Sequence, residues 1–107
     1  MAATLIDDPV LRRFRRALDE AYGSRIERVV LFGSRARGNA HPDSDYDVAV
    51  FLHGMADRST ELDLLADLST RFIEETGEFV HAMPYRARAY DQRTPLMLGI
   101  RRDGIDL

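Results

Sequence analysis

The sequence of 107 residues contains no cysteine and no lysine. The lack of cysteine excludes disulfide bonds and thiolate–zinc sites, and it fits a reducing cytoplasm. All 15 basic residues are arginine. Codon bias in the genome explains this without a functional cause; the alternative is that guanidinium groups suit phosphate. No apolar run approaches membrane-spanning length, and the N-terminus lacks the basic and apolar segments of a secretory signal. We therefore expect a cytoplasmic protein that does not contact a membrane.

The chain length indicates one compact domain over residues 1–107. A domain of this size exposes much of its surface and has little room for a separate substrate-binding lobe, so a partner is expected to complete the site. The net charge of -3 argues against general electrostatic affinity for nucleic acid. Direct nucleic-acid binding is therefore not expected.

Two apolar runs rich in β-branched residues predict buried strands, one over 26–32 and one over about 45–52. Between them lie a Gly33-Ser34 turn and an arginine-rich segment, which predicts a short helix that includes Arg35, Ala36 and Arg37, with Ser34 as its cap and Gly38-Asn39 as its end. The stretch His41-Pro42-Asp43-Ser44 predicts a turn. Small residues let a backbone approach an anion closely, and amides at a helix start lack internal partners. The turn is thus a candidate anion site, although a plain strand-to-helix turn remains the alternative.

Two carboxylates open the second predicted strand. Asp45 and Asp47 are two residues apart, so their side chains share a face of the strand, whereas Tyr46 points the other way. Like charges held this close repel each other unless a cation lies between them, and Mg²⁺ prefers such oxygen ligands. The alternative is that both are ordinary turn or strand-start residues.

At these residues the sequence resembles the DNA polymerase β-type nucleotidyltransferases, and in particular its minimal branch, the MNT proteins. The resemblance rests on Gly33-Ser34, then ten residues, then Asp45-Tyr46-Asp47. It implies an α/β fold with a small mixed sheet flanked by helices. It also implies metal ligation by Asp45 and Asp47, with two Mg²⁺ ions per site. Phosphate contacts would come from Gly33 and Ser34. Arg37 and Arg35 flank this turn and either neutralise triphosphate charge or face solvent, with Arg37 favoured, whereas Ser44 is predicted to form a hydrogen bond in the turn, with ligand contact as the alternative.

The resemblance fails at one position. Active members of the superfamily typically place a third carboxylate on the next strand, facing the first two. Here His81 stands at that position, and Glu78 lies on the opposite face of a regular strand. Either residue is a candidate for the third role, but a lone strand histidine is more often a packed or solvent-facing residue.

Outside the site, helical spacing predicts a helix from Pro9 to Tyr22, capped by Asp8. A second begins at Ser59 or Thr60 and ends at Gly77, and a short one spans 95–103 after Thr94. We expect a strand over 78–83, ended by Pro84 and parallel or mixed with the second strand, and a closing strand over 105–107. The apolar faces are predicted to include Ala21 in the first helix; Leu62, Leu65, Ala66, Phe72 and Ile73, widened by Leu64 and Leu68, in the second; and Leu96, Ile100 and Leu98 in the last.

The function implied by the resemblance is transfer of a nucleoside monophosphate, AMP from ATP, to an acceptor hydroxyl. Many MNT proteins are antitoxins paired with a HEPN-domain toxin, so the implied acceptor is a tyrosine on such a ribonuclease. The alternative is a catalytically weak or inactive module that neutralises its partner by binding. Transfer to a small molecule is less favoured, because no segment resembles an extra substrate lobe.

Overall fold

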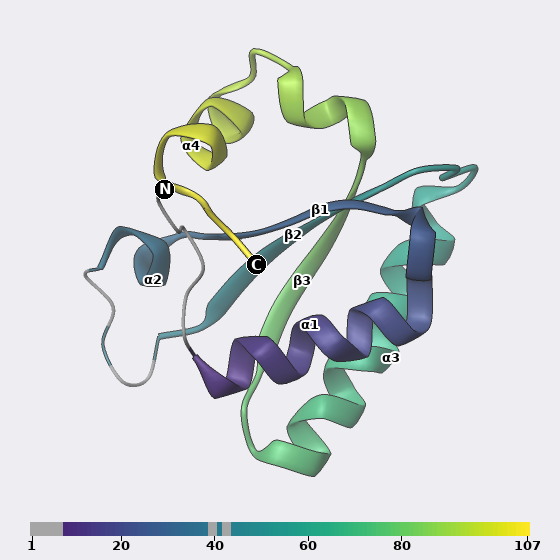
Figure 1. Ribbon diagram of the computed structural model, residues 1–107, viewed down its shortest axis with the longest axis vertical. Helices are drawn as coiled ribbons and strands as arrows, with labels where there is room; N and C mark the ends of the chain where they lie inside the picture. Colours follow the sequence, from purple (N-terminus) through teal and green to yellow (C-terminus); the bar gives the residue numbers. More distant parts are fainter. Residues whose placement is uncertain (1–7, 39–40, 42–43) are drawn as a thin grey trace.

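The computed structural model describes residues 8–38, 41 and 44–107. Their helices and strands form a four-stranded mixed sheet with helices on both faces (Figure 1). Strand order is β3-β2-β1-β4. The elements are α1(Pro9–Tyr22), the 3-10 helix η1(Gly23–Arg25), β1(Ile26–Phe32), α2(Ser34–Arg37), β2(Tyr46–Leu52), α3(Arg58–Thr76), β3(Val80–Arg86), the 3-10 helix η2(Ala87–Asp91), α4(Pro95–Asp103) and β4(Ile105–Asp106).

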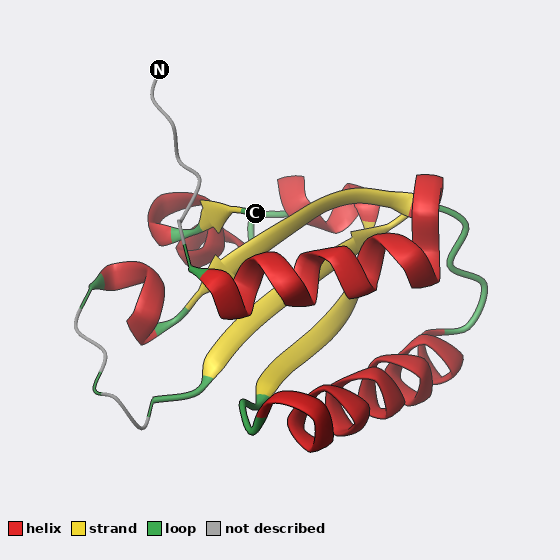
Figure 2. Cartoon of the chain, turned by 60° about the horizontal axis from the view of Figure 1, so that its bottom comes forward, coloured by secondary structure: helices red, strands yellow, loops and turns green. Residues whose placement is uncertain are grey.

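The sheet confirms the predicted mixed topology. Strand β1 pairs antiparallel with β2 and with β4, whereas β2 pairs parallel with β3. The parallel pair is joined through α3, since parallel neighbours need a long crossover connection. Val30, Ala49 and Phe51 pack with α4 on one face, and alternate strand residues pack with α1 and α3 on the other (Figure 2).

Helix α1 begins as predicted at Pro9. The Asp8 Oδ1 atom accepts hydrogen bonds from the backbone N–H groups of Val10 at 2.8 Å and Leu11 at 3.5 Å, which satisfies two amides of the first turn. The buried stripe is Leu11, Phe14, Leu18 and Tyr22. Ala21, predicted to belong to it, is exposed.

Helix α3 differs from its prediction in start and in rotation. Asp57, and not Ser59 or Thr60, caps it by accepting a hydrogen bond from the N–H of Ser59 at 3.0 Å. The buried residues are Glu61, Leu65, Leu68, Ser69 and Phe72. Leu65, Leu68 and Phe72 were predicted correctly, whereas Leu64 is 49% exposed, Ile73 is 39% exposed, Ala66 is exposed and Leu62 is half-buried.

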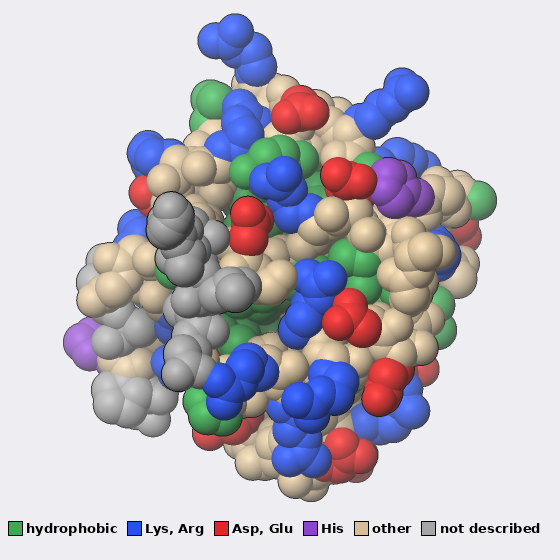
Figure 3. Space-filling view, viewed as in Figure 1, with side chains coloured by type: hydrophobic (Ala, Val, Ile, Leu, Met, Phe, Trp, Pro, Cys, Tyr) green, Lys and Arg blue, Asp and Glu red, His purple; other side chains and the backbone are tan. Residues whose placement is uncertain are grey.

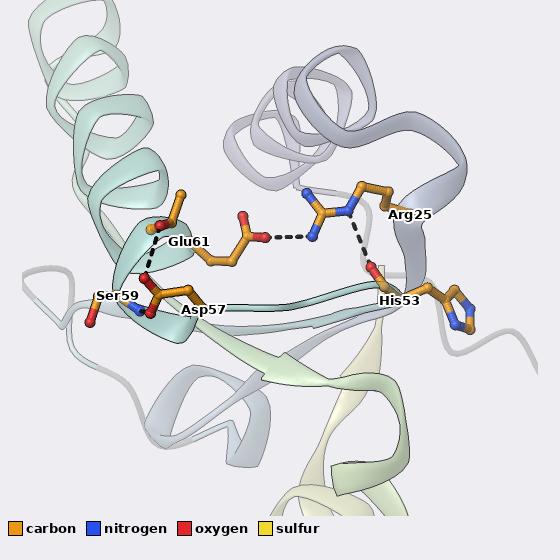
Figure 4. Close-up of polar contacts among 6 residues, drawn as sticks. Arg25, His53, Asp57, Ser59 and Glu61 are labelled. Carbon is orange, nitrogen blue, oxygen red and sulfur yellow. Dashed lines mark hydrogen bonds and ion pairs between the residues drawn. The ribbon is translucent and has the colours of Figure 1, made fainter.

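Two polar contacts set this rotation of α3. The hydroxyl of Ser69 donates to the carbonyl of Val80 at 2.7 Å, and buried Glu61 pairs with Arg25 at the end of η1 (Figure 4). Arg25 also donates from Nε to the His53 carbonyl at 3.1 Å. Hydrophobic spacing in the sequence does not reveal these contacts between η1, the end of β2 and α3, because the contacts depend on a buried charge.

Strand β3 begins two residues later than predicted and runs through Pro84. A proline lacks the N–H needed by a central strand, but it is tolerated on an edge strand. Because β3 is the edge of the sheet, Pro84 does not end it. Glu78 and Phe79 consequently lie outside the strand.

Helix α4 has the predicted bounds, with Thr94 Oγ1 accepting from the N–H of Met97 at 3.2 Å. Its buried residues are Met97 and Ile100. Leu96, expected to face inward, is 44% exposed, and Leu98 is 46% exposed. Met97 and Ile100, three residues apart, pack against Val30, Ala49 and Phe51 of the sheet, which turns Leu96 outward.

Within the described part of the chain, no helix combines the length and apolar character that crossing a bilayer requires.

Candidate functional site

Two of the predicted site residues, Asp47 and His81, lie in one row across three strands. Phe32 pairs with Asp47 between β1 and β2, and Asp47 pairs with His81 between β2 and β3. Paired residues on neighbouring strands present their side chains to the same face of a sheet. Asp47 and His81 therefore share the face that carries α4, directly beside the Gly33 corner.

Gly33 and Asp47 approach each other closely. Gly33 has φ 79° and ψ -159°, a conformation that L-residues rarely adopt. A β-carbon on Gly33 would lie 2.6 Å from Oδ2 of Asp47. The glycine therefore leaves the space that one carboxylate oxygen occupies, and the backbone corner faces the acid.

Gly33 is also the N-cap of α2, and no side chain caps this helix. The prediction that Ser34 is the cap is therefore wrong. Ser34 is half-buried at the first position of α2. The Gly33 carbonyl accepts the N–H groups of Ala36 and Arg37, each at 3.2 Å. This turn follows β1 directly and brings Ser34 to the same corner as Asp47.

Asp45 and Asp47 flank a residue that anchors the strand start. Tyr46 is buried, and its hydroxyl donates to Asp8 Oδ2 at 3.1 Å. Burial, and then the bond to Asp8, raise the pKa of the Tyr46 hydroxyl. Asp47 is half-buried with its side chain 32% exposed, and Asp45 is exposed just before β2. Tyr46 thus fixes the strand start from the face opposite to that of Asp47.

Arg35 contacts two residues at or just before the start of β2. Its guanidinium lies 4.0 Å from the Tyr46 ring centroid, and its Nε donates to the Ser44 carbonyl at 2.9 Å. Ser44 Oγ accepts from the N–H of His41 at 2.9 Å, which makes it a turn residue. Arg35 and Ser44 therefore hold the segment before β2. Residues 42 and 43 of the predicted turn, and residue 39 of the predicted helix end, lie outside the described residues.

Arg37 is exposed and lines a groove between α2 and α4. The groove has a volume of about 280 Å³ and includes Gly33. Asp103 lies on the same groove, and hydrogen bonding to Arg102 lowers the pKa of its carboxyl, with a smaller contribution from Arg37. The sequence does not indicate this groove, because the groove depends on how α4 packs beside α2.

His81, on β3, lies beside Asp47. Its Nδ1 lies 3.5 Å from Asp47 Oδ1, with the His81 side chain 54% exposed. The Phe79 ring stacks beside it, with centroids 6.4 Å apart and planes inclined by 17°. Exposed Glu78 precedes β3, and its N–H donates to Thr76 Oγ1 at 3.0 Å. The structure thus brings His81, and not Glu78, next to Asp47.

The donor chemistry at this corner fits a hard divalent cation. Both carboxylates reach solvent, and such ions take oxygen ligands while keeping waters and phosphate oxygens. Among the residues that the structure describes, no group of three or more His, Asp or Glu side chains converges as a complete metal cage. Two carboxylates alone would not fill the coordination of such an ion.

Comparison with known proteins points to one family. A family model described as "Nucleotidyltransferase domain" matches residues 11–93. A protein of Methanocaldococcus jannaschii named "Putative protein adenylyltransferase" is 29% identical over 77 residues, covering 72% of this chain and 71% of its own length.

Two solved structures share the fold. A toxin–antitoxin with AMP-PNP aligns over 94% of this chain and 72% of its own, with TM-score 0.59 and 20% identity. A "putative nucleotidyltransferase" from Sulfolobus solfataricus aligns over 91% of this chain and 75% of its own, with TM-score 0.60 and 20% identity. The match of the family model covers the Gly-Ser corner, both aspartates and the whole sheet apart from β4. The chain therefore belongs to the nucleotidyltransferase domain family.

Proposed function

We propose that this protein transfers AMP from ATP to a hydroxyl group of a partner protein, and that the partner is a HEPN-type ribonuclease toxin which the modification silences. In this proposal, residues 1–107 act as one minimal domain in the cytoplasm. The observation that carries it is the close approach of Gly33 to Asp47 Oδ2, because it sets a backbone corner against a carboxylate in the family's signature order.

Each residue at the corner has a role in this proposal. Asp45 and Asp47 would hold two Mg²⁺ ions, which neutralise triphosphate charge and lower the pKa of the acceptor hydroxyl when bound. Gly33 and Ser34 would donate N–H groups, and Ser34 its hydroxyl, to the β- and γ-phosphates. Arg37 would add positive charge from the exposed side of α2. Catalysis would consist mainly of positioning and charge stabilisation.

The choice of ATP and of a toxin partner draws support from the similar proteins. One relative is named as a protein adenylyltransferase, and one structure of the same fold is a toxin–antitoxin with AMP-PNP. In this proposal the accepting hydroxyl belongs to a tyrosine of the partner. We do not assign direct nucleic-acid binding, because the net charge is -3 and Figure 3 shows acidic and basic side chains interspersed on the face that it presents.

A second candidate function is neutralisation by complex formation without transfer. Its specific support is His81, which lies 3.5 Å from Asp47 where active superfamily members typically carry a third carboxylate. An imidazole beside Asp47 provides one fewer anionic oxygen for metal ions. Binding with weak or absent turnover would follow.

The test is transfer of label from ATP, labelled at its α-phosphate, in the presence of Mg²⁺ and the protein encoded by the neighbouring reading frame. Our proposal predicts label on that protein, release of pyrophosphate and loss of its ribonuclease activity. Matched samples contain Asp45→Asn and Asp47→Asn, with Asp63→Asn on the exposed side of α3 as the control.

The outcomes separate the two functions. Label that depends on Asp45 and Asp47 but not on Asp63 supports transfer. Inhibition of the partner without label, unchanged by both site variants, would replace transfer with neutralisation by binding. If the partner is neither labelled nor bound, both functions are contradicted.

A further inference from the structure

We infer that the groove between α2 and α4 holds the nucleobase and ribose of the nucleotide, an inference that rests on the proposed function. The groove is lined by the end of β1, by α2 and by one side of α4. Both views of the chain place α2 and α4 at the same end of the sheet (Figures 1 and 2). Its lining includes Phe32, Gly33, Arg37, Leu96, Gly99 and Asp103.

The groove is continuous with the proposed phosphate corner. Gly33 lines it, and the same glycine lies against Asp47 Oδ2. Arg37, the other shared residue, is exposed on the wall formed by α2. A nucleotide whose phosphates lie against Gly33 therefore has the rest of its structure next to this groove.

The walls have the chemistry of a nucleoside site. Leu96 is 44% exposed and, together with Phe32, provides apolar surface for a flat ring. Gly99 leaves a gap in α4, since an added β-carbon there would meet no atom within 4 Å. Arg102 and Asp103 form a two-bond pair at 3.1 and 3.0 Å on the rim, where their polar atoms can meet ribose hydroxyls or ring nitrogens.

Size and position favour this occupant over others. A volume of about 280 Å³ suits a nucleoside and is small for a protein segment. A groove of about 310 Å³ between α1 and α3 includes Ala17, Leu68 and Phe72 but none of the predicted site residues. Continuity with Gly33 therefore distinguishes the α2–α4 groove.

Gly99→Trp tests the inference by filling the groove. Binding of ATP and of inorganic tripolyphosphate, which lacks base and ribose, is measured by calorimetry with Mg²⁺. We expect ATP affinity to fall by about tenfold or more while tripolyphosphate affinity stays within about twofold. Leu98→Trp is the matched control and should bind both ligands like the unaltered chain, because Leu98 is exposed on α4 outside the groove lining.

A reporter variant keeps the test valid if Gly99→Trp does not fold. The chain has no tryptophan, so Leu96→Trp places the only indole on the groove wall, and Leu98→Trp places it on exposed surface outside the groove lining. ATP, but not tripolyphosphate, should change the emission of Leu96→Trp. Neither ligand should change that of Leu98→Trp.

The outcomes separate the groove from the phosphate corner. Undiminished ATP binding by Gly99→Trp, or an equal loss of both ligands, would overturn the nucleoside site while leaving the proposed function intact. So would an ATP response shared by both tryptophan reporters. If the unaltered chain binds neither ATP nor tripolyphosphate with Mg²⁺, the proposed function fails and the groove assignment fails with it.

Discussion

Gly33 and Asp47 occupy complementary space: a β-carbon on the glycine would lie 2.6 Å from Oδ2 of the carboxylate. The other oxygen of Asp47, Oδ1, lies 3.5 Å from Nδ1 of His81. One acid thus contacts the backbone corner after β1 on one side and the edge strand β3 on the other. Asp47 therefore lies between the Gly33 corner and His81.

Gly33→Ala should damage both stability and nucleotide binding. The backbone conformation, nearly restricted to glycine, costs about 1–3 kcal/mol for alanine, and the carboxylate must also move. Gly38→Ala is the control, because Gly38 also has φ 79° but an added β-carbon meets no atom within 4 Å. Urea unfolding and calorimetry with ATP should show lower stability for both variants and weaker binding for Gly33→Ala alone. Equal ATP affinities would contradict the assigned contact.

Asp47→Asn and Asp45→Asn should each lower AMP transfer by about 100-fold or more, since charge stabilisation at a reacting phosphate is lost. Stability should be unchanged or slightly higher, because two neighbouring negative charges no longer repel. Initial rates and thermal unfolding, measured on the same samples, check both statements. A variant that unfolds early would assign the lost activity to the fold.

His81→Asp should raise the transfer rate, by about tenfold, because a third anionic oxygen beside Asp47 improves metal binding. His81→Ala should not. Rates measured across Mg²⁺ concentrations for the three proteins check this, with half-saturation for His81→Asp at lower Mg²⁺. A fall in rate for both variants would assign His81 a role of its own.

Arg25→Met should cost about 2 kcal/mol of stability, because it leaves Glu61 buried without its cation. Glu61→Met should cost less, since the Arg25 side chain is 38% exposed and can be hydrated. The double variant should recover much of the loss. Denaturant unfolding of the three variants measures this order, and equal losses for the two single variants would contradict it.

Alkaline pH should weaken the fold through Tyr46. Burial and the bond to Asp8 raise the Tyr46 pKa above its ordinary value of 10.0, so the unfolded chain releases this proton first. Stability therefore falls as pH rises above about 10. Tyr46→Phe should reduce this fall while costing about 1 kcal/mol at neutral pH through the lost hydrogen bond.

Tyr22→Phe provides the comparison for Tyr46→Phe. Burial, and next the charge of Glu61, raise the Tyr22 pKa. Its buried hydroxyl has no hydrogen-bond partner among the described residues. Tyr22→Phe should therefore also reduce the alkaline fall, but with no loss at neutral pH. Unfolding free energies from pH 7 to 11 check both variants; a neutral-pH loss for Tyr22→Phe would indicate a partner for the hydroxyl.

The local signals in the sequence predicted the elements at the site well. The β-branched run of β1, the Gly33-Ser34 turn and the Thr94 and Asp8 caps lie where predicted. These features follow from residues close together in the chain. The parallel pairing of β2 and β3 also followed, because the intervening helix requires a crossover.

Features that depend on distant contacts could not be predicted in this way. The rotation of α3 follows from the Glu61–Arg25 pair, and the passage of β3 through Pro84 follows from its edge position. The outward position of Leu96 follows from the packing of Met97 and Ile100. In each case, tertiary packing overrode a local pattern that favoured a different assignment.

The central claim is that the Gly33 corner and the two aspartates hold a magnesium-bound triphosphate together. Calorimetric titration of the full chain with ATP, with Mg²⁺ and again with EDTA, tests it most directly. We predict saturable binding with Mg²⁺ that disappears with EDTA and in the Asp45→Asn, Asp47→Asn double variant. Binding of equal strength with and without Mg²⁺, or undiminished binding by the folded double variant, would contradict the claim.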